Sequence, residues 1–402
     1  MNDPRALPSA GAALRLRNLA RVLAEIRRRR EAARVEIAEA LELSPATVTA
    51  VIGDLLDEGL IQETTPAAGA GRGRPRVGLR LNPDARRVAG AKISDDRIAA
   101  AILDFEGAIL GEGAAPLPAR RVDLAGLCAA LDAALAEALA AAGLDAGEVD
   151  ALGLGVPGFV DMGTGRVHWS PVLTGAPVDL APALAARLPF PVFVDNDANL
   201  ATLAELWFGL GRGARDFLVV TIEHGVGMGI VIDGRVFRGA RGLGAEFGHT
   251  KIQNEGALCR CGQRGCLEAY VADYALAREA GAALGEFGES AAHGALLARL
   301  AEAAEAGDER SRSIYRRAGR MLGLGLANLV NIFDPPQIIL SGERMRQHHL
   351  IAEELEATLE RNRLATGAPA ARLTVHRWGD ALWAMGGGAL ALDGLTERIA
   401  GG

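Results

Sequence analysis

Apolar residues recur at helical spacing in three successive segments of the first sixty residues. They are Leu16, Leu19, Val22, Leu23 and Ile26 in the first segment, Ile37, Ala38 and Leu41 in the second, and Val48, Ile52, Leu55 and Leu56 in the third. The second and third segments are joined by "ELS", in which Ser44 is a favourable N-cap and Pro45 a favourable first helical residue. Gly59 is a typical helix end. The pattern predicts a long helix followed by a helix, a short turn and another helix.

The N-terminal end of the third predicted helix is slim and polar. Ala46 is small, and Ser44, Thr47 and Thr49 carry hydroxyl groups. A recognition helix needs such a start to enter the major groove of DNA and reach base edges. We therefore expect these four residues to contact DNA.

The segment from 60 to 83, "LIQETTPAAGAGRGRPRVGLRLNP", has the pattern of a strand, a Gly-rich tip and a second strand. Its tip carries Arg72, Arg74 and Arg76, and extended arginines of this kind can lie along a narrow minor groove. A flexible linker in an Arg-rich protein is the alternative. The position directly after the helix-turn-helix pattern favours a β-hairpin wing, and this module resembles the winged helix-turn-helix of bacterial regulators.

From about residue 87 the pattern changes to strands mixed with helices. The expected elements are a β-meander in "RVAGAKISDDRIAAAILDFEGAILGEG", a helix in "LAGLCAALDAALAEALAAAG", a strand and turn in "VDALGLGVPGFVD", a strand and helix in "FPVFVDNDANLATLAELWFGLG", a Gly-rich β-hairpin from 216, helices between 265 and 331, and a late strand in "PPQIILSGE". Strands in two sets, each followed by helices, predict two α/β lobes with a cleft between them.

Charge differs between the two parts of the chain. Residues 1–88 hold 15 Arg and 11 acidic residues, a net charge of +4, whereas the other residues hold 28 basic and 39 acidic residues, a net charge of −11. A basic N-terminal module on an acidic body indicates a polyanionic partner, with a solvated basic face as the alternative. The 402 residues contain no uninterrupted run of eighteen apolar residues, and the start lacks the apolar core of a signal peptide. We expect a cytoplasmic protein without a membrane partner.

Three of the four cysteines, Cys259, Cys261 and Cys266, lie within eight residues, and His249 precedes them by ten. Structural disulfides are unusual in the cytoplasm, so redox thiols and a metal site are the remaining interpretations. One histidine and three thiolates suit a tetrahedral Zn²⁺ site. The fourth cysteine, Cys128, lies on an Ala- and Leu-rich helix and is expected to be a small buried hydrophobic residue.

Three motifs together resemble the ROK family of sugar kinases and sugar-responsive repressors: "VDNDANLATLAE", "GAEFGH" and "CRCGQRGCLE". The resemblance covers roughly residues 88–402. It implies an α/β fold of two actin-like (RNase H-like) lobes around a sugar cleft, and a structural zinc site made by His249, Cys259, Cys261 and Cys266. The winged module matches the regulator branch, because the kinases lack it. We predict a DNA-binding domain at 1–86 and a sugar-sensing domain at 87–402, with lobes of 87–195 plus 380–402 and 196–379.

The resemblance also implies which residues contact sugar. They are Gly158, Asn196, Asp197, Glu246, His249 and Glu268. Carboxylates and amides suit this role because a sugar presents both hydroxyl donors and acceptors. One position departs from the family: Val172 stands in "WSPVLTG" where an asparagine often touches the sugar, so one polar contact to the usual sugar is missing.

Asp197 matches the catalytic base of the family's kinases, but the phosphate-binding motifs differ. "KISDD" (92–96) replaces Asp-x-Gly-Gly-Thr, "EHG" (223–225) replaces Gly-Thr-Gly, and "SGE" (341–343) replaces a Gly-Gly turn. Phosphoryl transfer depends on backbone amides and cations around the phosphates, so carboxylates there oppose it. We therefore expect no ATP, no catalytic residue and no enzyme activity.

These features predict a sugar-responsive transcriptional regulator, and a repressor in particular. Its expected partners are operator double-stranded DNA and a small sugar effector, and its expected assembly is a homodimer or a dimer of dimers. A sugar kinase with an appended DNA-binding domain is the enzyme alternative. A constitutive architectural DNA-binding protein is a third possibility, which the sugar-contact residues disfavour.

Overall fold

The computed structural model describes residues 10–64, 77–284, 293–365, 367, 369–377 and 381–401. It divides into two units, Met1–Gly213 with Asp380–Gly402, and Ala214–Gly379. Each unit is described by itself below.

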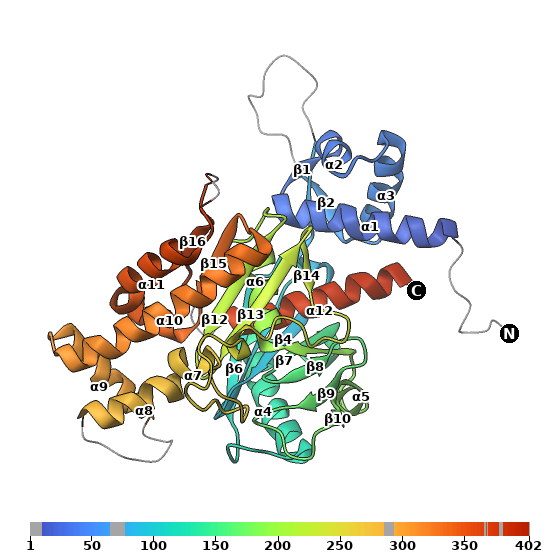
Figure 1. The fold of residues 1–402 in the computed structure, drawn as a ribbon. Coiled ribbons are helices and arrows are strands. Elements are labelled where there is room, and N and C mark those ends of the chain that lie inside the picture. Colours follow the sequence, from blue (N-terminus) through green and yellow to red (C-terminus); the bar gives the residue numbers. More distant parts are fainter. Residues whose placement is uncertain are drawn as a thin grey trace. The chain divides into compact units, whose positions relative to one another are not determined.

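Three helices and a small antiparallel sheet form the N-terminal module (Figure 1). Its elements are α1 (Ala10–Arg29), β1 (Ala32–Ala33), α2 (Arg34–Leu41), α3 (Pro45–Asp57), β2 (Ile61–Thr64) and β3 (Gly78–Leu81). The predicted apolar faces meet in one core, in which Leu23, Ile26, Ile37, Ile52 and Leu55 are fully buried. Burying each of these side chains contributes about 1.5–3 kcal/mol. The helix-turn-helix and the antiparallel β2–β3 pair of the wing are therefore confirmed.

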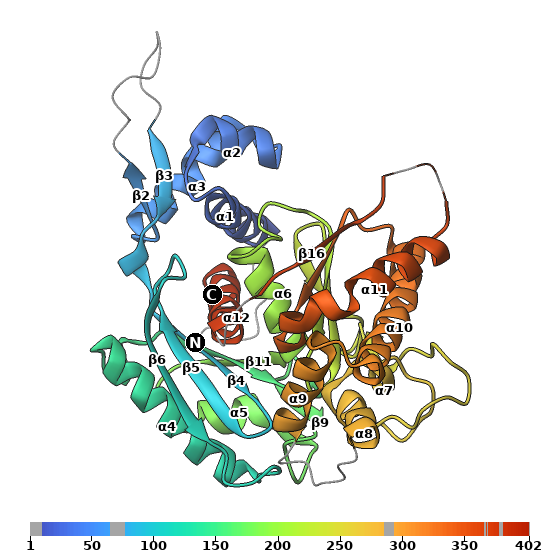
Figure 2. The ribbon, with the colours of Figure 1, turned by 90° about the vertical axis from the view of Figure 1, so that its left-hand side faces the viewer.

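The rest of the first unit is built on a five-stranded sheet with the order β11-β7-β4-β5-β6. Its elements are β4 (Val88–Ile93), β5 (Arg97–Leu103), β6 (Ile109–Pro116), α4 (Leu124–Ala142), β7 (Ala151–Val156), β8 (Phe159–Asp161), β9 (Arg166–Trp169), β10 (Val178–Asp179), α5 (Leu180–Ala185), β11 (Val192–Asn196), α6 (Asp197–Trp207) and α12 (Ala381–Gly401). The first three strands form the predicted antiparallel meander, and β7 and β11 join it in parallel. Helix α4 covers one face of the sheet and α12 the other (Figure 2).

The second unit repeats this strand pattern. Its sheet has the order β14-β13-β12-β15-β16, in which three antiparallel strands are again joined by two parallel strands. Its elements are β12 (Phe217–Ile222), β13 (Val226–Ile232), β14 (Arg235–Phe237), η3 (Phe247–His249), α7 (Glu268–Val271), α8 (Asp273–Leu284), α9 (His293–Glu305), α10 (Glu309–Phe333), β15 (Gln337–Ser341), η5 (Glu343–Gln347), α11 (His348–Asn362) and β16 (Arg372–Val375). The shared strand order confirms a doubled α/β fold.

The unit boundary differs from the predicted lobe boundary. The sequence places the end of the first lobe segment at residue 195, whereas the first unit continues to Gly213 and includes α6. The physical reason is the packing of α6 against α12. A Cβ atom on Gly386 of α12 would lie 2.2 Å from the carbonyl oxygen of Leu200 on α6, so the two helices approach at backbone distance.

Helix α4 is long and apolar enough to cross a membrane by length and composition alone. It packs against β5 and β6, and Leu127, Leu131 and Ala134 on its inner face are fully buried. These contacts are those of a core helix in an α/β unit. Cys128 is buried on the same helix, as predicted.

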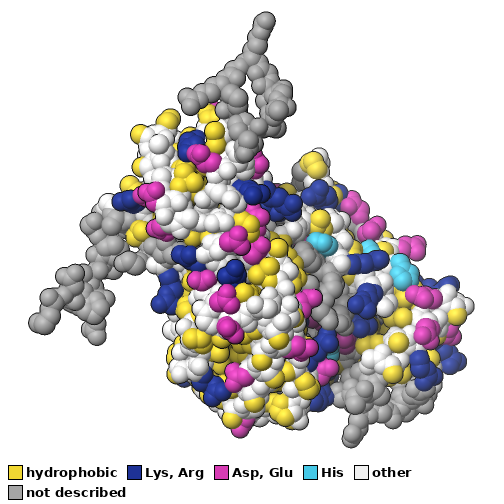
Figure 3. All heavy atoms as spheres, turned by 180° about the vertical axis from the view of Figure 1, so that it is seen from behind, with side chains coloured by type: hydrophobic (Ala, Val, Ile, Leu, Met, Phe, Trp, Pro, Cys, Tyr) yellow, Lys and Arg dark blue, Asp and Glu magenta, His cyan; other side chains and the backbone are white. Residues whose placement is uncertain are grey.

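Acidic and basic side chains are interspersed over the face drawn in Figure 3. Such mixed charge is typical of a solvated surface and does not by itself attract a polyanion.

Candidate functional site

The loop between η3 and α7 brings the predicted metal ligands together. Its chain folds back through two antiparallel bridges, Lys251 with Cys266 and Leu258 with Arg264. Within the second bridge, the Cys259 N–H donates to the Gln263 carbonyl at 2.8 Å, which closes a tight turn. Gly262 and Gly265 bend the chain with φ values of +85° and +77°. These are left-handed conformations in which glycine is favoured.

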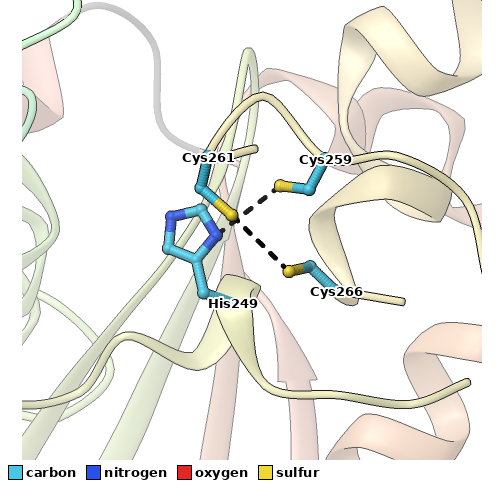
Figure 4. A group of neighbouring side chains, drawn as sticks. All are labelled: His249, Cys259, Cys261 and Cys266. Atoms are coloured by element: carbon cyan, nitrogen blue, oxygen red, sulfur yellow. Dashed lines mark hydrogen bonds between the residues drawn. The ribbon is translucent and has the colours of Figure 1, made fainter. Parts of the chain in front are cut away.

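The donor atoms of His249, Cys259, Cys261 and Cys266 all lie within 4.8 Å of one another (Figure 4). Cys259 Sγ lies 3.7 Å from His249 Nδ1, and Cys261 Sγ lies 3.7 Å from Cys266 Sγ. Tetrahedral Zn²⁺ with Zn–S bonds of about 2.3 Å and a Zn–N bond of about 2.0 Å separates neighbouring ligand atoms by roughly 3.5–3.8 Å. The donor set and its spacing therefore fit zinc. With Nδ1 directed at this cluster, His249 keeps Nε2 for another partner.

Burial, a lysine and a tyrosine surround the thiols of the cluster. Burial raises the pKa of the Cys259 thiol to about 12. Lys251 Nζ lies 2.8 Å from a different thiol of the cluster, Cys266 Sγ. Tyr274, whose pKa burial raises, donates its hydroxyl to Cys259 Sγ at 3.6 Å.

Glu268 is buried beside the same cluster. Its Oε1 accepts from the Tyr274 hydroxyl at 3.4 Å and lies 3.6 Å from Cys259 Sγ, and its Oε2 accepts from the Val226 N–H at 3.3 Å. The carboxylate thus ties the cysteine loop to β13. Of the other two predicted sugar contacts in the second unit, Glu246 is exposed and directly precedes η3, and His249 is half-buried in it.

Three predicted sugar contacts lie together in the first unit. Asn196 ends β11 and caps α6, since its side-chain oxygen accepts from the Ala198 N–H at 2.8 Å. Its Nδ2 donates to the Gly158 carbonyl at 2.9 Å. Gly158 has a φ of +123°, and a Cβ there would lie 2.2 Å from the Trp169 carbonyl, so only glycine fits the turn. Asp197 is the first residue of α6 and remains partly exposed.

Val172 is fully enclosed in the core of the first unit, with 1% of its surface exposed. Its backbone N–H is held by the Ser170 hydroxyl at 3.3 Å. The side chain at this position therefore packs inward and offers no polar group to a ligand.

The turns that replace the phosphate motifs are closed by their own contacts. In the β4–β5 turn, the Ser94 N–H donates to the Arg97 carbonyl at 2.8 Å, and Asp95 forms an ion pair with Arg120 at 3.6 Å. In the β12–β13 turn, the Glu223 N–H donates to the Gly225 carbonyl at 2.9 Å. These backbone amides are directed into the turns.

The predicted DNA contacts fall into two groups. Ser44 caps α3 by accepting from the Thr47 N–H at 3.1 Å, and Ser44, Ala46 and Thr49 are exposed while Thr47 is partly exposed. The second group, Arg72, Arg74 and Arg76, lies outside the described residues.

Sequence reasoning missed Lys251 and Tyr274 as neighbours of the cysteine cluster. The sequence does carry a signal for Lys251, because it is one of only two lysines in a chain with 41 arginines and it lies two residues after His249. Tyr274 reaches Cys259 from α8, and no local spacing indicates that contact.

The fold and the sites define a class of protein, in which a winged helix-turn-helix precedes an α/β body with a doubled strand order. Comparison with protein families matches residues 16–62 to a winged helix-turn-helix DNA-binding module and residues 88–393 to the ROK family. The chain belongs to the ROK family, which confirms the predicted resemblance and fold class.

Relatives and solved structures agree with this assignment. The DNA-binding transcriptional dual regulator NagC of Escherichia coli K12 is 29% identical over 328 residues, covering 81% of this chain and 80% of the relative. The crystal structure of a ROK family transcriptional regulator, a homologue of the E. coli Mlc protein, has a TM-score of 0.79 at 27% identity, covering 96% of this chain and 99% of the other. A ROK glucokinase from Streptomyces griseus, solved with glucose and AMPPNP, has a TM-score of 0.66 at 32% identity, covering 76% of this chain and 99% of the kinase.

Proposed function

We propose that this protein is a sugar-responsive transcriptional repressor. The observation that carries the proposal is the folded winged helix-turn-helix in front of the ROK domain, with the N-terminal end of α3 exposed. NagC, which matches 81% of this chain at 29% identity, is named as a DNA-binding transcriptional dual regulator. A ROK sugar kinase with an added DNA-binding module remains the enzyme alternative, since glucokinases also match the ROK domain.

Operator recognition is assigned to α3 and the wing. Ser44, Ala46, Thr47 and Thr49 meet base edges and phosphates in the major groove, and Arg72, Arg74 and Arg76 follow the minor groove. A homodimer presents two such modules to two half-sites, one helical turn or a multiple apart. The protein acts in the cytoplasm, where operator DNA and sugars are both present.

Sugar recognition is assigned to Gly158, Asn196 and Asp197 of the first unit and to Glu246, His249 and Glu268 of the second. Asn196 and Asp197 stand at the start of α6, where carboxylate and amide oxygens can accept from sugar hydroxyls. The glycine at 158 lets the backbone approach a ring closely. The inward-facing Val172 removes one polar contact, which favours a sugar with fewer or differently placed hydroxyls on that side.

His249, Cys259, Cys261 and Cys266 would hold a structural zinc ion, which supplies a rigid crosslink and no reactive position. The fixed loop would orient Nε2 of His249 toward a sugar hydroxyl while Nδ1 faces the metal. Lys251 offsets part of the thiolate charge, and Tyr274 and Glu268 hold Cys259 in place from α8 and α7.

Phosphate transfer is disfavoured at the two turns described above. Asp95 and Glu223 bring carboxylates to positions where the kinases of the family bind phosphate, and like charges about 4 Å apart cost roughly 1–4 kcal/mol near a protein surface. The turns also use their amides internally. Asp197 serves as a hydrogen-bond acceptor for a sugar hydroxyl and not as a catalytic base.

One experiment separates the regulator from the kinase. Purified full-length protein is screened by thermal unfolding against free N-acetylglucosamine, glucose and xylose and against the 6-phosphates of the two hexoses, because a specific ligand raises the apparent stability. Each stabilising sugar is then incubated with protein, ATP and Mg²⁺, and sugar phosphate is measured. We expect stabilisation without turnover. Turnover that disappears in Asp197→Asn would establish the kinase instead.

A further inference from the structure

A buried arginine joins the DNA-binding module to the body of the first unit. Arg27 lies in the last turn of α1, and only 7% of its surface is exposed. Its guanidinium carbon lies 3.9 Å from the ring centroid of Trp207 and 5.4 Å from that of Phe105. Trp207 is the last residue of α6, so the helix that starts at Asn196 and Asp197 ends on this arginine.

A second arginine, in the loop after α6, forms hydrogen bonds with the same turn of α1. Arg212 donates from Nε to the Arg28 carbonyl at 3.0 Å and from Nη2 to the Arg27 carbonyl. A guanidinium at a helix C-terminus satisfies carbonyls that lack a partner within the helix and complements the helix dipole. The loop itself is held by Glu205, which accepts from the Leu210 N–H at 2.8 Å.

The contacts of Arg27 are not the arrangement that would stabilise the fold most. Nε and Nη2 of Arg27 are buried without a hydrogen-bond partner among the residues that the structure describes. Burial lowers the pKa of Arg27 to about 10, against the opposing effect of Asp393 on α12, so the side chain remains a cation at neutral pH. Cations buried in this way often cost more free energy than apolar residues of the same size. Their better-supported role is to select one arrangement among alternatives.

The two helices that meet at Arg27, α6 and α1, each extend to one of the proposed binding sites, α6 to the sugar contacts and α1 to the DNA-binding helix α3. Helix α6 has eleven residues, and residues 198–205 are all buried, so it is a stiff rod of about 16 Å. Its first residues are the proposed sugar contacts. On the other side, α1 packs against α3, and Arg15 forms an ion pair with Asp54 of α3.

We infer that Arg27, clamped by Trp207 and Arg212, is the positioning contact through which sugar binding at the start of α6 changes operator binding by α3. This inference rests on the proposed function and assigns its regulation to one contact. A sugar can shift the equilibrium between two arrangements only by differential binding, and a contact that differs between them carries the coupling. Removing the clamp should therefore uncouple the two sites without abolishing either.

The test compares full-length variants. An operator duplex is selected from a random pool by the wild-type protein, and its Kd is measured by fluorescence anisotropy with and without the stabilising sugar among N-acetylglucosamine, glucose and xylose. Trp207→Leu removes the ring, and Arg27→Met replaces the cation with an apolar chain of similar length. Trp207→Phe keeps an aromatic face, and Arg187→Met, at the exposed ion pair with Asp132, is the matched control.

We expect the sugar-induced fold-change in operator Kd to fall about fivefold or more in Trp207→Leu and Arg27→Met. The Phe variant and the control should keep most of the response, and sugar affinity by calorimetry should stay within about threefold of wild type in every variant. A wild-type sugar response in both Trp207→Leu and Arg27→Met would overturn this inference and leave the proposed function intact. Loss of sugar affinity in Trp207→Leu would also overturn it, because the effect would then lie in sugar binding. A wild-type protein whose operator binding ignores every sugar would overturn the proposed function as well.

Discussion

Replacing Gly265 with alanine tests whether the geometry of the cysteine loop holds the metal. Gly265 directly precedes Cys266, has a φ of +77°, and a Cβ there would lie 1.8 Å from the Gln253 carbonyl oxygen. Gly262 directly follows Cys261 and has a φ of +85°, but a Cβ there would have no atom within 4 Å. The two alanine variants therefore differ in the backbone clash and share the left-handed strain.

The expected magnitudes follow from these contacts. Left-handed backbone costs an ordinary residue about 1–2 kcal/mol, which applies to both variants. The clash in Gly265→Ala also moves the backbone around Gln253. Two hydrogen bonds of Gly265 lie there: its carbonyl accepts from the Ile252 N–H, and its N–H donates to the Ala257 carbonyl, each at 2.9 Å. Losing both bonds costs about 2 kcal/mol more. If the loop reaches this geometry only when metal is bound, the difference corresponds to roughly 30-fold weaker zinc binding in Gly265→Ala than in Gly262→Ala.

The assay is a competition for zinc between each variant and a chromophoric chelator, paired with thermal unfolding in zinc and in EDTA. We expect one zinc per chain in the wild type, a modest loss of affinity in Gly262→Ala and a much larger one in Gly265→Ala. Equal zinc affinities in the two variants would refute the reasoning, because the loop would then tolerate the displaced backbone.

Three further predictions concern DNA and sugar. Ser44→Ala removes the cap on α3 and should cost about 1 kcal/mol of stability in the DNA-binding module, measured by thermal unfolding, with weaker operator binding; unchanged values in both would show that the cap with Thr47 is dispensable. Replacing Arg72 and Arg74 with alanine should weaken binding to all duplexes alike and reduce the salt slope of log Kd by about two; a change in sequence preference alone would contradict this. Asp197→Asn should lose about 1–3 kcal/mol of sugar binding by calorimetry while it binds the operator normally; a full sugar response in this variant would exclude the carboxylate as a contact.

The local parts of the molecule were predictable from the sequence. The N-terminal helices follow from apolar spacing, and the closeness of the three cysteines follows from their position within eight residues of one another, whereas the place of His249 beside them follows from the resemblance to the ROK family. Contacts between distant segments were not predictable in this way. The approach of α6 to α12 depends on Gly386, which is 186 residues from Leu200 along the chain, and the clamp on Arg27 joins side chains 180 residues apart. Arg27 begins a run of four arginines that ends at Arg30, where a solvated charge is the ordinary expectation, and its burial depends on aromatic residues from two other segments.

The central claim is that a sugar controls operator binding by this protein. The most direct measurement is the anisotropy of a labelled operator duplex bound to the wild-type, zinc-loaded protein during titration with N-acetylglucosamine, glucose or xylose in the absence of ATP. The account predicts that one of these sugars releases the duplex over a saturable range, with operator Kd rising about fivefold or more. Operator binding that stays constant through saturating concentrations of a sugar that binds the protein by calorimetry would contradict it.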